Sequence, residues 1–365
     1  MSIELIISLV KANIVLAVLL TNTILLIWFE RKVVAGMQSR VGPDRAGPFG
    51  ILQTLADAIK LLLKEQILPS KADRAMYLLA PLIALVPSFL IFMIIPLGPD
   101  ITVEWQNALY TIPLVGADLN VGVLYFLALS SIAVYSVVLA GWSSGSKYPL
   151  LGGVRASAQM ISYEAAMGLA LVPVILYSGS LSLVDIVNSQ SGNLSSSIPI
   201  LNTIVSFIPK WNIFPQFVAF GIFFIAAVAE VNRAPFDLVE AEQELVGGFH
   251  TEYSGFRFAM FFLAEYINMF NMCAITATFF LGGWLGPTFE GILPPIFSVI
   301  MPIIWLGVKT FLLLFVFVWI RATLPRLRYD QLMELGWKRM IPLSLVRLIL
   351  SAIVLGLREF GLPLS

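Results

Sequence analysis

The segment from Ala229 to Tyr253 concentrates carboxylates directly after an apolar stretch. It reads AEVNRAPFDLVEAEQELVGGFHTEY and holds one fixed cation, Arg233. Desolvation and mutual repulsion raise carboxylate pKa values toward neutrality, and groups that interact in this way titrate as a coupled set. The spacing leaves two interpretations open, a proton relay or a solvated acidic loop. The six acids are Glu230, Asp237, Glu240, Glu242, Glu244 and Glu252.

Two further carboxylates lie inside apolar stretches. Glu164 belongs to SYEAAMGLALVPVILY, and Glu265 lies near the start of the stretch 258–281. An ionised side chain at the centre of a membrane helix costs at least about 2.5–3.5 kcal/mol, so it faces protein or water. With Glu230, which closes the stretch before the acidic segment, these acids are expected to gather at one level. Helix-start chemistry explains Asp237 and Glu240, which have the spacing of a capping box, but not the other acids.

Three isolated residues have competing interpretations. Lys309 lies within a late apolar stretch, where it is expected to reach the outer surface or to pair with a buried acid. His250 is the single histidine; its ordinary pKa suits proton transfer, although a lone loop histidine is more often incidental. Cys273 has no internal disulfide partner and is expected to be a core residue. We find no Cys cluster, phosphate loop or Rossmann signature in the sequence.

The elements that must position these residues are membrane helices. Of the 365 residues, 59% are hydrophobic and 12% are charged, whereas soluble domains are about a quarter charged. Apolar runs of about 20 residues have the length of membrane-crossing helices. We therefore predict an all-α membrane protein, one polytopic domain over 1–365. Its zero net charge gives no sign of nucleic-acid binding. About eight spans are expected, at 5–29, 75–97, 119–142, 159–178, 214–230, 258–281, 302–323 and 340–357.

The distribution of Lys and Arg predicts the orientation. These residues are frequent in 30–74 and 324–339 and absent from 98–118 and 282–301. Because basic connections stay on the cytoplasmic side, we place 30–74 and the acidic loop 230–257 there and both termini on the opposite side. The first apolar run lacks a signal-peptide cleavage site, so it is expected to remain as an anchor. The outward stretch 179–213 is expected to be a surface linker.

An amphipathic helix is expected on the cytoplasmic side, beginning near Phe49. Gln53, Asp57, Lys60 and Lys64 recur at intervals of 4, 3 and 4, which places them on one stripe. Such a helix either stabilises the bundle or forms one wall of a ligand chamber at the membrane surface. We find no internal repeat, which argues against a secondary transporter.

Four segments resemble a known family. They read ERKVVAGMQSRVGPDRAGPFGILQTLADAIKLLLKE (30–65), GWSSGSKYPLLGGVRASAQMISYE (141–164), the acidic segment quoted above, and WIRATLPRLRYDQLMELGWK (319–338). Together they are similar to subunit 1, also called H, of proton-pumping NADH:quinone oxidoreductase, respiratory complex I. The resemblance covers nearly the whole chain. It implies a membrane subunit that docks a peripheral arm carrying FMN and iron–sulfur clusters, forms the quinone access route and lower chamber, and begins the coupling path to the pumping subunits.

The resemblance also implies roles for particular residues. Arg31, Arg40 and Asp57 fall in the segment that lines quinone access, and Arg326 and Arg328 fall in a docking loop. Ser131 stands where some members carry a further glutamate, which would remove one branch of the acidic path. Its implied proton path comprises Glu164, Glu230, Asp237, Glu240, Glu242, Glu244, Glu252 and Glu265.

The resemblance implies a setting as well. Expected partners are the other membrane-arm and peripheral-arm subunits, membrane lipid, and a quinone, either ubiquinone or menaquinone, as substrate. The expected location is a bacterial inner membrane. Competing hypotheses are the equivalent anchor of a membrane-bound hydrogenase-type complex, an independent ion transporter, and a purely structural anchor.

Overall fold

The protein is a bundle of long apolar helices. The computed structural model describes residues 3–105, 108–193, 209–237, 247–287 and 296–359. Within these ranges seven helices are long and apolar enough to cross a membrane, and the shorter apolar helix α8 (Phe217–Glu230) matches the fifth predicted span. The all-α membrane fold is therefore confirmed, and about eight spans agrees with seven long helices and one short one. The long helices are α1 (Ile3–Met37), α3 (Arg74–Met93), α4 (Gly122–Ser143), α5 (Lys147–Ser178), α10 (Gly255–Phe280), α11 (Ile296–Thr323), and α13 (Ile341–Glu359), which continues α12 (Tyr329–Glu334) and the π-helical turn η3 (Leu335–Met340).

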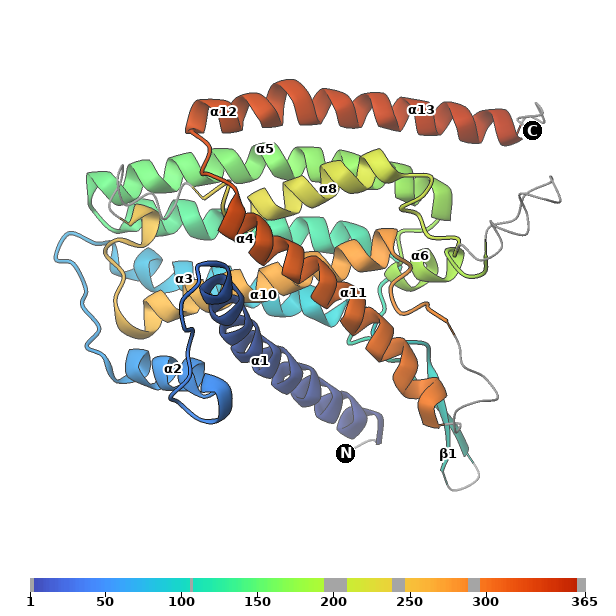
Figure 1. The fold of residues 1–365 in the computed structure, drawn as a ribbon, viewed down its shortest axis with the longest axis horizontal. Coiled ribbons are helices and arrows are strands. Elements are labelled where there is room, and N and C mark those ends of the chain that lie inside the picture. Colours follow the sequence, from blue (N-terminus) through green and yellow to red (C-terminus); the bar gives the residue numbers. More distant parts are fainter. Residues whose placement is uncertain (1–2, 106–107, 194–208, 238–246, 288–295, 360–365) are drawn as a thin grey trace.

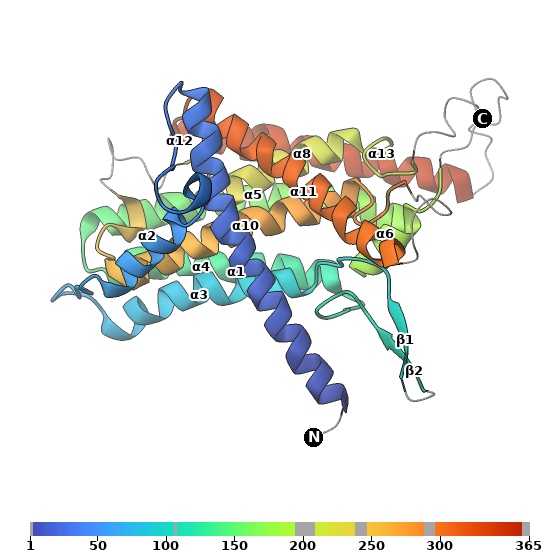
Figure 2. The same cartoon turned by 60° about the horizontal axis from the view of Figure 1, so that its bottom comes forward.

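The helices form a central group with peripheral helices around it. Helices α3, α4, α5, α8 and α10 run alongside one another, and α13 lies against α5 (Figure 1). Helices α1 and α11 cross the group at an angle, and the N-terminal half of α1 extends away from the other helices (Figure 2). The acids of the central helices are thus enclosed by neighbouring helices, whereas much of α1 is exposed to its surroundings.

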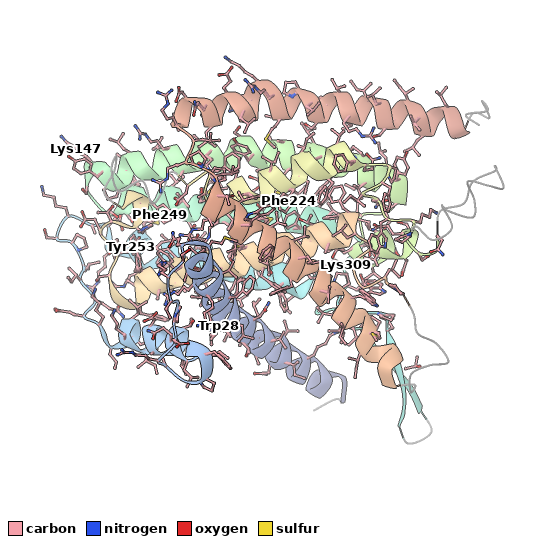
Figure 3. All side chains as sticks on the ribbon, in the orientation of Figure 1. Trp28, Lys147, Phe224, Phe249, Tyr253 and Lys309 are labelled. Carbon is pink, nitrogen blue, oxygen red and sulfur yellow. The ribbon has the colours of Figure 1, made fainter. Side chains whose placement is uncertain are left out.

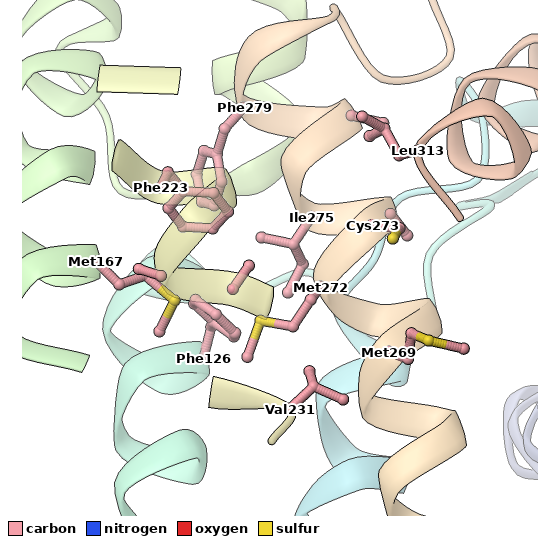
Figure 4. Packing of buried hydrophobic residues seen from close by; sticks show 14 of the residues in the cluster. Phe126, Met167, Phe223, Val231, Met269, Met272, Cys273, Ile275, Phe279 and Leu313 are labelled. Carbon is pink, nitrogen blue, oxygen red and sulfur yellow. The ribbon is translucent and has the colours of Figure 1, made fainter. Parts of the chain in front are cut away.

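The centre of the bundle is packed with aromatic and aliphatic side chains. Phe126, Met167, Phe223 and Phe279 come from four different helices and are fully buried around the contact of α8 with α10 (Figure 4). Cys273 is also fully buried, which confirms the predicted core role. Close packing of this kind fixes the helices that carry the acids, because core side chains interdigitate with few voids.

Local sequence sets several helix ends. The Asp73 side chain accepts hydrogen bonds from the amides of Ala75 and Met76 and so caps the start of α3. At the end of α5, Gly179 has a φ of 68° and its amide donates to the carbonyl of Ile175, the left-handed ending that glycine favours.

The connection 30–74, between the first and second predicted spans, is partly as predicted. Helix α1 continues to Met37, eight residues beyond the predicted span end at Phe29, and it ends before the turn-forming pair Gly42–Pro43. A short 3-10 turn, η1 (Pro48–Gly50), leads into α2 (Gln53–Leu63). The predicted amphipathic helix is therefore present, although it starts at Gln53. The four predicted apolar positions of this helix are between 44% and 55% exposed within this chain: Leu52, which directly precedes it, and Leu55, Ile59 and Leu62.

Two further elements were not predicted from the sequence. Within its described residues, the stretch 179–213 is more than a surface linker, since helix α6 (Leu183–Ser189) buries Leu183, Ile186 and Val187 against the bundle. An antiparallel hairpin of β1 (Ile101–Trp105) and β2 (Ala108–Ile112) pairs Ile101 with Ile112. In Figure 1 the hairpin, α6 and the final turns of α13 lie toward the same end of the molecule.

Candidate functional site

A buried network of charges joins three helices and the turn after α8. Glu30 of α1 is 3% exposed, and its Oε1 lies 3.1 Å from Nη1 of Arg233. The same carboxylate pairs with Arg321 of α11. On its other side, Arg233 places Nε 2.7 Å from Oε1 of Glu265 on α10. The order Arg321, Glu30, Arg233, Glu265 alternates in sign, so each buried charge has a partner of opposite sign.

The turn after α8 is built to hold Arg233 in this network. The guanidinium carbon lies 4.4 Å from the ring centroid of Tyr266. Gln159 of α5 donates through Nε2 to the carbonyls of Ala229 (2.9 Å) and Phe236 (2.8 Å), one on each side of the turn. Burial alone would lower the pKa of Arg233, but Glu265 and Glu30 hold that pKa well above its ordinary value. Arg233 is therefore a fixed positive charge between two carboxylates.

Glu164 and Glu230 each receive a hydroxyl from α4. Ser131 donates to Oε1 of Glu164, and Ser130 donates to Oε1 of Glu230 at 3.1 Å. Glu230 is 6% exposed, and its second oxygen, Oε2, has no hydrogen-bond partner among the described residues. The structure thus brings two of the predicted acids, from α5 and α8, against consecutive residues of one helix.

Three predicted acids share one cavity. Glu230, Asp237 and Glu265 line one cavity, partly open to solvent, together with His250 and Asn268. Residues of α3, α4 and α5 close the cavity on its other sides. The chain thus gathers carboxylates from α8, the following turn and α10 in one partly enclosed space. Such an arrangement can hold water and exchange protons, because buried polar groups retain water when several of them converge.

His250 lines this cavity and lies among aromatic rings. Its ring centroid is 5.1 Å from that of Phe249, 5.3 Å from that of Phe258 and 5.8 Å from that of Phe262. The 3-10 turn η2 (Gly248–His250) that carries it sits directly on α5, where Gly152 approaches Gly248. The sequence allows two interpretations of His250, an incidental loop residue or a proton carrier. In the structure it lines the same cavity as Glu230, Asp237 and Glu265.

The other predicted acids are less central. Glu252 is half-buried, and its backbone carbonyl accepts a 2.8 Å hydrogen bond from the hydroxyl of Tyr77. Tyr77 stacks on Tyr253 with ring centroids 4.1 Å apart, and burial raises the pKa of Tyr253. This side of the acidic segment is therefore fastened to α3 by its backbone and its aromatic rings. The predicted acids Glu240, Glu242 and Glu244 lie outside the described residues.

The predicted docking loop touches the acidic segment. Nη2 of Arg326 lies 3.5 Å from Oδ2 of Asp237, and the amide of Leu327 donates to the carbonyl of Pro235. Arg328 precedes α12, where its amide donates to Oε1 of Gln331 at 3.2 Å. Of the two predicted loop arginines, Arg326 therefore contacts the site directly and Arg328 helps to start a helix.

The three predicted access residues lie around the end of α1. Nη1 of Arg31 is 2.6 Å from Oδ2 of Asp57, which links α1 to α2, and both side chains are partly exposed. Arg40 donates to Gln38 at 2.7 Å. Arg31 and Arg40 line a second pocket, which also contains Glu30, Arg321 and Tyr266. The charge network thus has one end in this pocket, through Arg321 and Glu30, and the other in the acidic cavity, through Glu265.

Lys309 behaves differently from both expectations. It is 5% exposed, and its ammonium donates to the carbonyls of Leu281 (2.6 Å), Gly283 (2.9 Å) and Leu285. It also lies 4.3 Å from the ring centroid of Trp211. Reaching the surface and pairing with a buried acid are both wrong for the described part of the chain, because three carbonyls at the end of α10 take all the donors. Figure 3 shows Lys309 well along the bundle from Phe249 and Tyr253.

Two members of the charge network, Glu30 and Arg321, did not stand out in the sequence. Glu30 ends the first apolar run next to Arg31 and Lys32, so its place in the sequence gives no sign that it is buried. Its burial depends on Arg233 and Arg321, which come from distant parts of the chain. Within the described ranges there is no group of three or more His, Cys, Asp or Glu residues that could hold a metal ion.

Comparison with known proteins shows the family of this chain. The family model described as NADH dehydrogenase matches residues 10–352. A protein of Koribacter versatilis, named as an H-type subunit of NADH-quinone oxidoreductase, is 47% identical over 362 residues, which cover 97% of this chain and 98% of that protein. Proteins with the same name from Syntrophobacter fumaroxidans and Geobacter sulfurreducens are each 50% identical, over 93% and 94% of this chain and 93% and 95% of their own lengths.

Proposed function

Because this chain belongs to the NADH dehydrogenase family along nearly its whole length, we propose that it is the H-type membrane-arm subunit of an NADH-quinone oxidoreductase. In this role it forms the quinone chamber together with the peripheral arm and couples quinone reduction to proton translocation. The observation that carries the proposal is the charge network from Arg321 through Glu30 and Arg233 to Glu265. It connects a pocket at the end of α1 with a cavity lined by carboxylates.

The pocket at the end of α1 is the proposed quinone side. Arg31 and Arg40 supply positive charge there, and Tyr266 supplies an aromatic wall. Donors of this kind stabilise negative charge that develops on a quinone oxygen during reduction. The partner subunits would hold FMN and the iron–sulfur clusters that deliver the electrons. Ubiquinone and menaquinone both carry oxygens that these donors suit.

The acidic cavity is the proposed start of the proton path. Reduction of a quinone consumes protons and creates negative charge nearby, and carboxylates close to one another respond to that charge as a coupled set. Glu265 touches the charge network, while Glu230 and Asp237 face the same cavity. A change of charge in the pocket therefore reaches these acids through Arg233. Glu164 extends the path into α5.

The proposed setting follows the family. The chain would lie in a bacterial inner membrane, with 30–74 and the acidic loop on the cytoplasmic side and both termini on the other. Its partners would be the remaining membrane-arm subunits, the peripheral arm and lipid. The exposed apolar face of α2 and the contact of Arg326 with Asp237 are compatible with a cytoplasmic surface that other subunits cover.

Labelling by a quinone tests the proposal. A photoreactive quinone analogue applied to the assembled complex in native membranes should label peptides around Glu30, Arg40 or Tyr266, and unlabelled quinone should prevent the labelling. The isolated chain in liposomes should show no proton flux. Labelling elsewhere only, flux through the isolated chain, or a purified complex with nickel–iron chemistry and no quinone reduction would each overturn the proposal.

A further inference from the structure

Two consecutive serines of α4 reach two carboxylates that belong to different helices. Ser130 donates to Glu230 at the end of α8, and Ser131 donates to Glu164 of α5. Adjacent residues of a helix point about 100° apart. One turn of α4 can therefore direct one serine to α8 and the next serine to α5. In the sequence, Ser131 stands out only as the place of a missing carboxylate, and Ser130 does not stand out.

The hydroxyl of Ser131 has two acceptors within reach. One is the carboxylate of Glu164, and the other is the carbonyl of Leu127, one turn back on α4, at 3.1 Å. A hydroxyl has one proton to give and can accept as well. When Glu164 is ionised, Ser131 can donate to it. When Glu164 carries a proton, Glu164 can donate to Ser131, whose own proton then turns to Leu127.

Burial makes the hydrogen bonds of these two serines important for the acids. Ser130 is 3% exposed and Glu230 is 6% exposed, so solvent cannot easily replace a lost hydrogen bond there. A buried charged group that loses its hydrogen bond loses far more than an exposed one. Ser131 and Glu164 are half-buried, in direct continuation of this site. The residues Ala133, Ser136 and Val137 of the same helix line the acidic cavity, so α4 faces the acids over two turns.

We propose that Ser130 and Ser131 are paired positioning residues, which hold Glu230 and Glu164 against α4, and that Ser131 reverses its hydrogen bond when Glu164 gains or loses a proton. The proposal rests on the proposed function, since it concerns the same proton path. In this arrangement both protonation states of Glu164 keep a hydrogen bond. Each change of state also alters the bond between Ser131 and Leu127. The hydrogen bonding of one turn of α4 therefore changes with the protonation state of Glu164.

The test uses the assembled complex in liposomes, with Ser131→Ala, Ser131→Thr and Ser130→Ala. Ser88→Ala is the control, because Ser88, like Ser130, is buried in a long apolar helix, and its hydroxyl donates within its own helix, to the carbonyl of Ala84. Two quantities are measured: the rate of NADH-driven proton translocation, and the infrared band of the protonated carboxyl group of Glu164. That band is identified by its disappearance in Glu164→Gln.

Ser131→Ala should lower proton translocation about tenfold, the effect of one hydrogen bond to a charged group, and should move the Glu164 band. Ser130→Ala should lower translocation by a similar factor. Ser131→Thr keeps the hydroxyl and should restore both quantities, and Ser88→Ala should change neither. The proposal is overturned if Ser131→Ala leaves the rate or the band unchanged, or if threonine fails to restore them. Because the wild-type complex is measured alongside, absence of pumping there would instead count against the proposed function.

Discussion

Removing Arg233 perturbs the charge network at its centre. Arg233→Met keeps much of the length of the side chain but removes the charge between Glu30 and Glu265, which lie 3.1 and 2.7 Å from it. Breaking a buried ion pair by removing one partner costs about 3–5 kcal/mol. Glu30 keeps Arg321, and the side chain of Glu265 is 27% exposed. The loss of stability should therefore lie near the lower end of this range, at about 3 kcal/mol, which corresponds to about a hundredfold change in an equilibrium constant.

Heat inactivation of the purified complex measures this loss. For a large membrane complex the practical stability is a rate, so the half-life at a fixed temperature is compared between variants. The double variant Arg233→Met with Glu265→Gln removes one charge of each sign, and it should recover about 1–2 kcal/mol of the loss because the two residues are in direct contact. The matched control is Arg31→Met, whose ion pair with Asp57 is partly exposed and should contribute less than about 1 kcal/mol.

Two outcomes would refute this reasoning. If Arg233→Met were as stable as Arg31→Met, the buried network would not hold the bundle together. If the double variant were no more stable than the single one, the loss would come from packing around Tyr266 rather than from an uncompensated charge. NADH oxidation with an artificial acceptor of the peripheral arm should stay constant in every variant, which separates these effects from failed assembly.

Three further changes have defined outcomes. Gly152→Ala would bring a methyl group to 2.7 Å from the Cα of Gly248, so the amount of assembled complex in membranes should fall. Gly221→Ala, where an added methyl group would meet nothing within 4 Å, is the control and should assemble normally. Equal amounts of the two variants would contradict the close approach of Gly152 to Gly248. Lys309→Met removes the donor from the buried carbonyl of Gly283 and from the part-buried carbonyls of Leu281 and Leu285. An unsatisfied buried acceptor costs about 1–3 kcal/mol, so the complex should lose heat stability while the surviving molecules pump at the normal rate per NADH; a loss of pumping without a loss of stability would contradict a structural role. Gln159→Leu removes both hydrogen bonds across the turn that holds Arg233, so its stability loss should be smaller when combined with Arg233→Met than in the wild-type background; fully additive losses would contradict the coupling.

The span pattern was predictable because it is local. A run of apolar residues has the length of the membrane, and its position follows from composition alone. The stripe of Gln53 and Asp57 likewise predicted a surface helix, and the two side chains hydrogen-bond at 3.1 Å. Helix α6 and the hairpin escaped prediction because short elements lack a strong periodic signal, and α6 depends on the burial of Ile186 and Val187 against the bundle.

The candidate site was predictable only in part. Glu164, Glu230 and Glu265 were predicted because an ionised side chain within a membrane helix is energetically costly and usually has a functional role. Glu30 did not stand out, since it adjoins basic residues at the end of its run, and its burial follows from contacts with Arg233, 203 positions away, and Arg321, 291 positions away. Lys309 was wrongly expected to reach the surface or an acid, because backbone carbonyls at a helix end leave no mark in a sequence.

Proton translocation by the Glu230→Gln variant tests most directly the claim that these acids couple quinone reduction to pumping. The change keeps the size of the side chain and removes its ability to ionise. Protons moved and NADH oxidised are recorded together for the assembled complex in sealed liposomes, with Glu334→Gln, an exposed change on α12, as the control. We predict that translocation falls at least about tenfold in Glu230→Gln and stays normal in Glu334→Gln. Translocation by Glu230→Gln at the wild-type rate, in a complex that assembles fully, would contradict the claim.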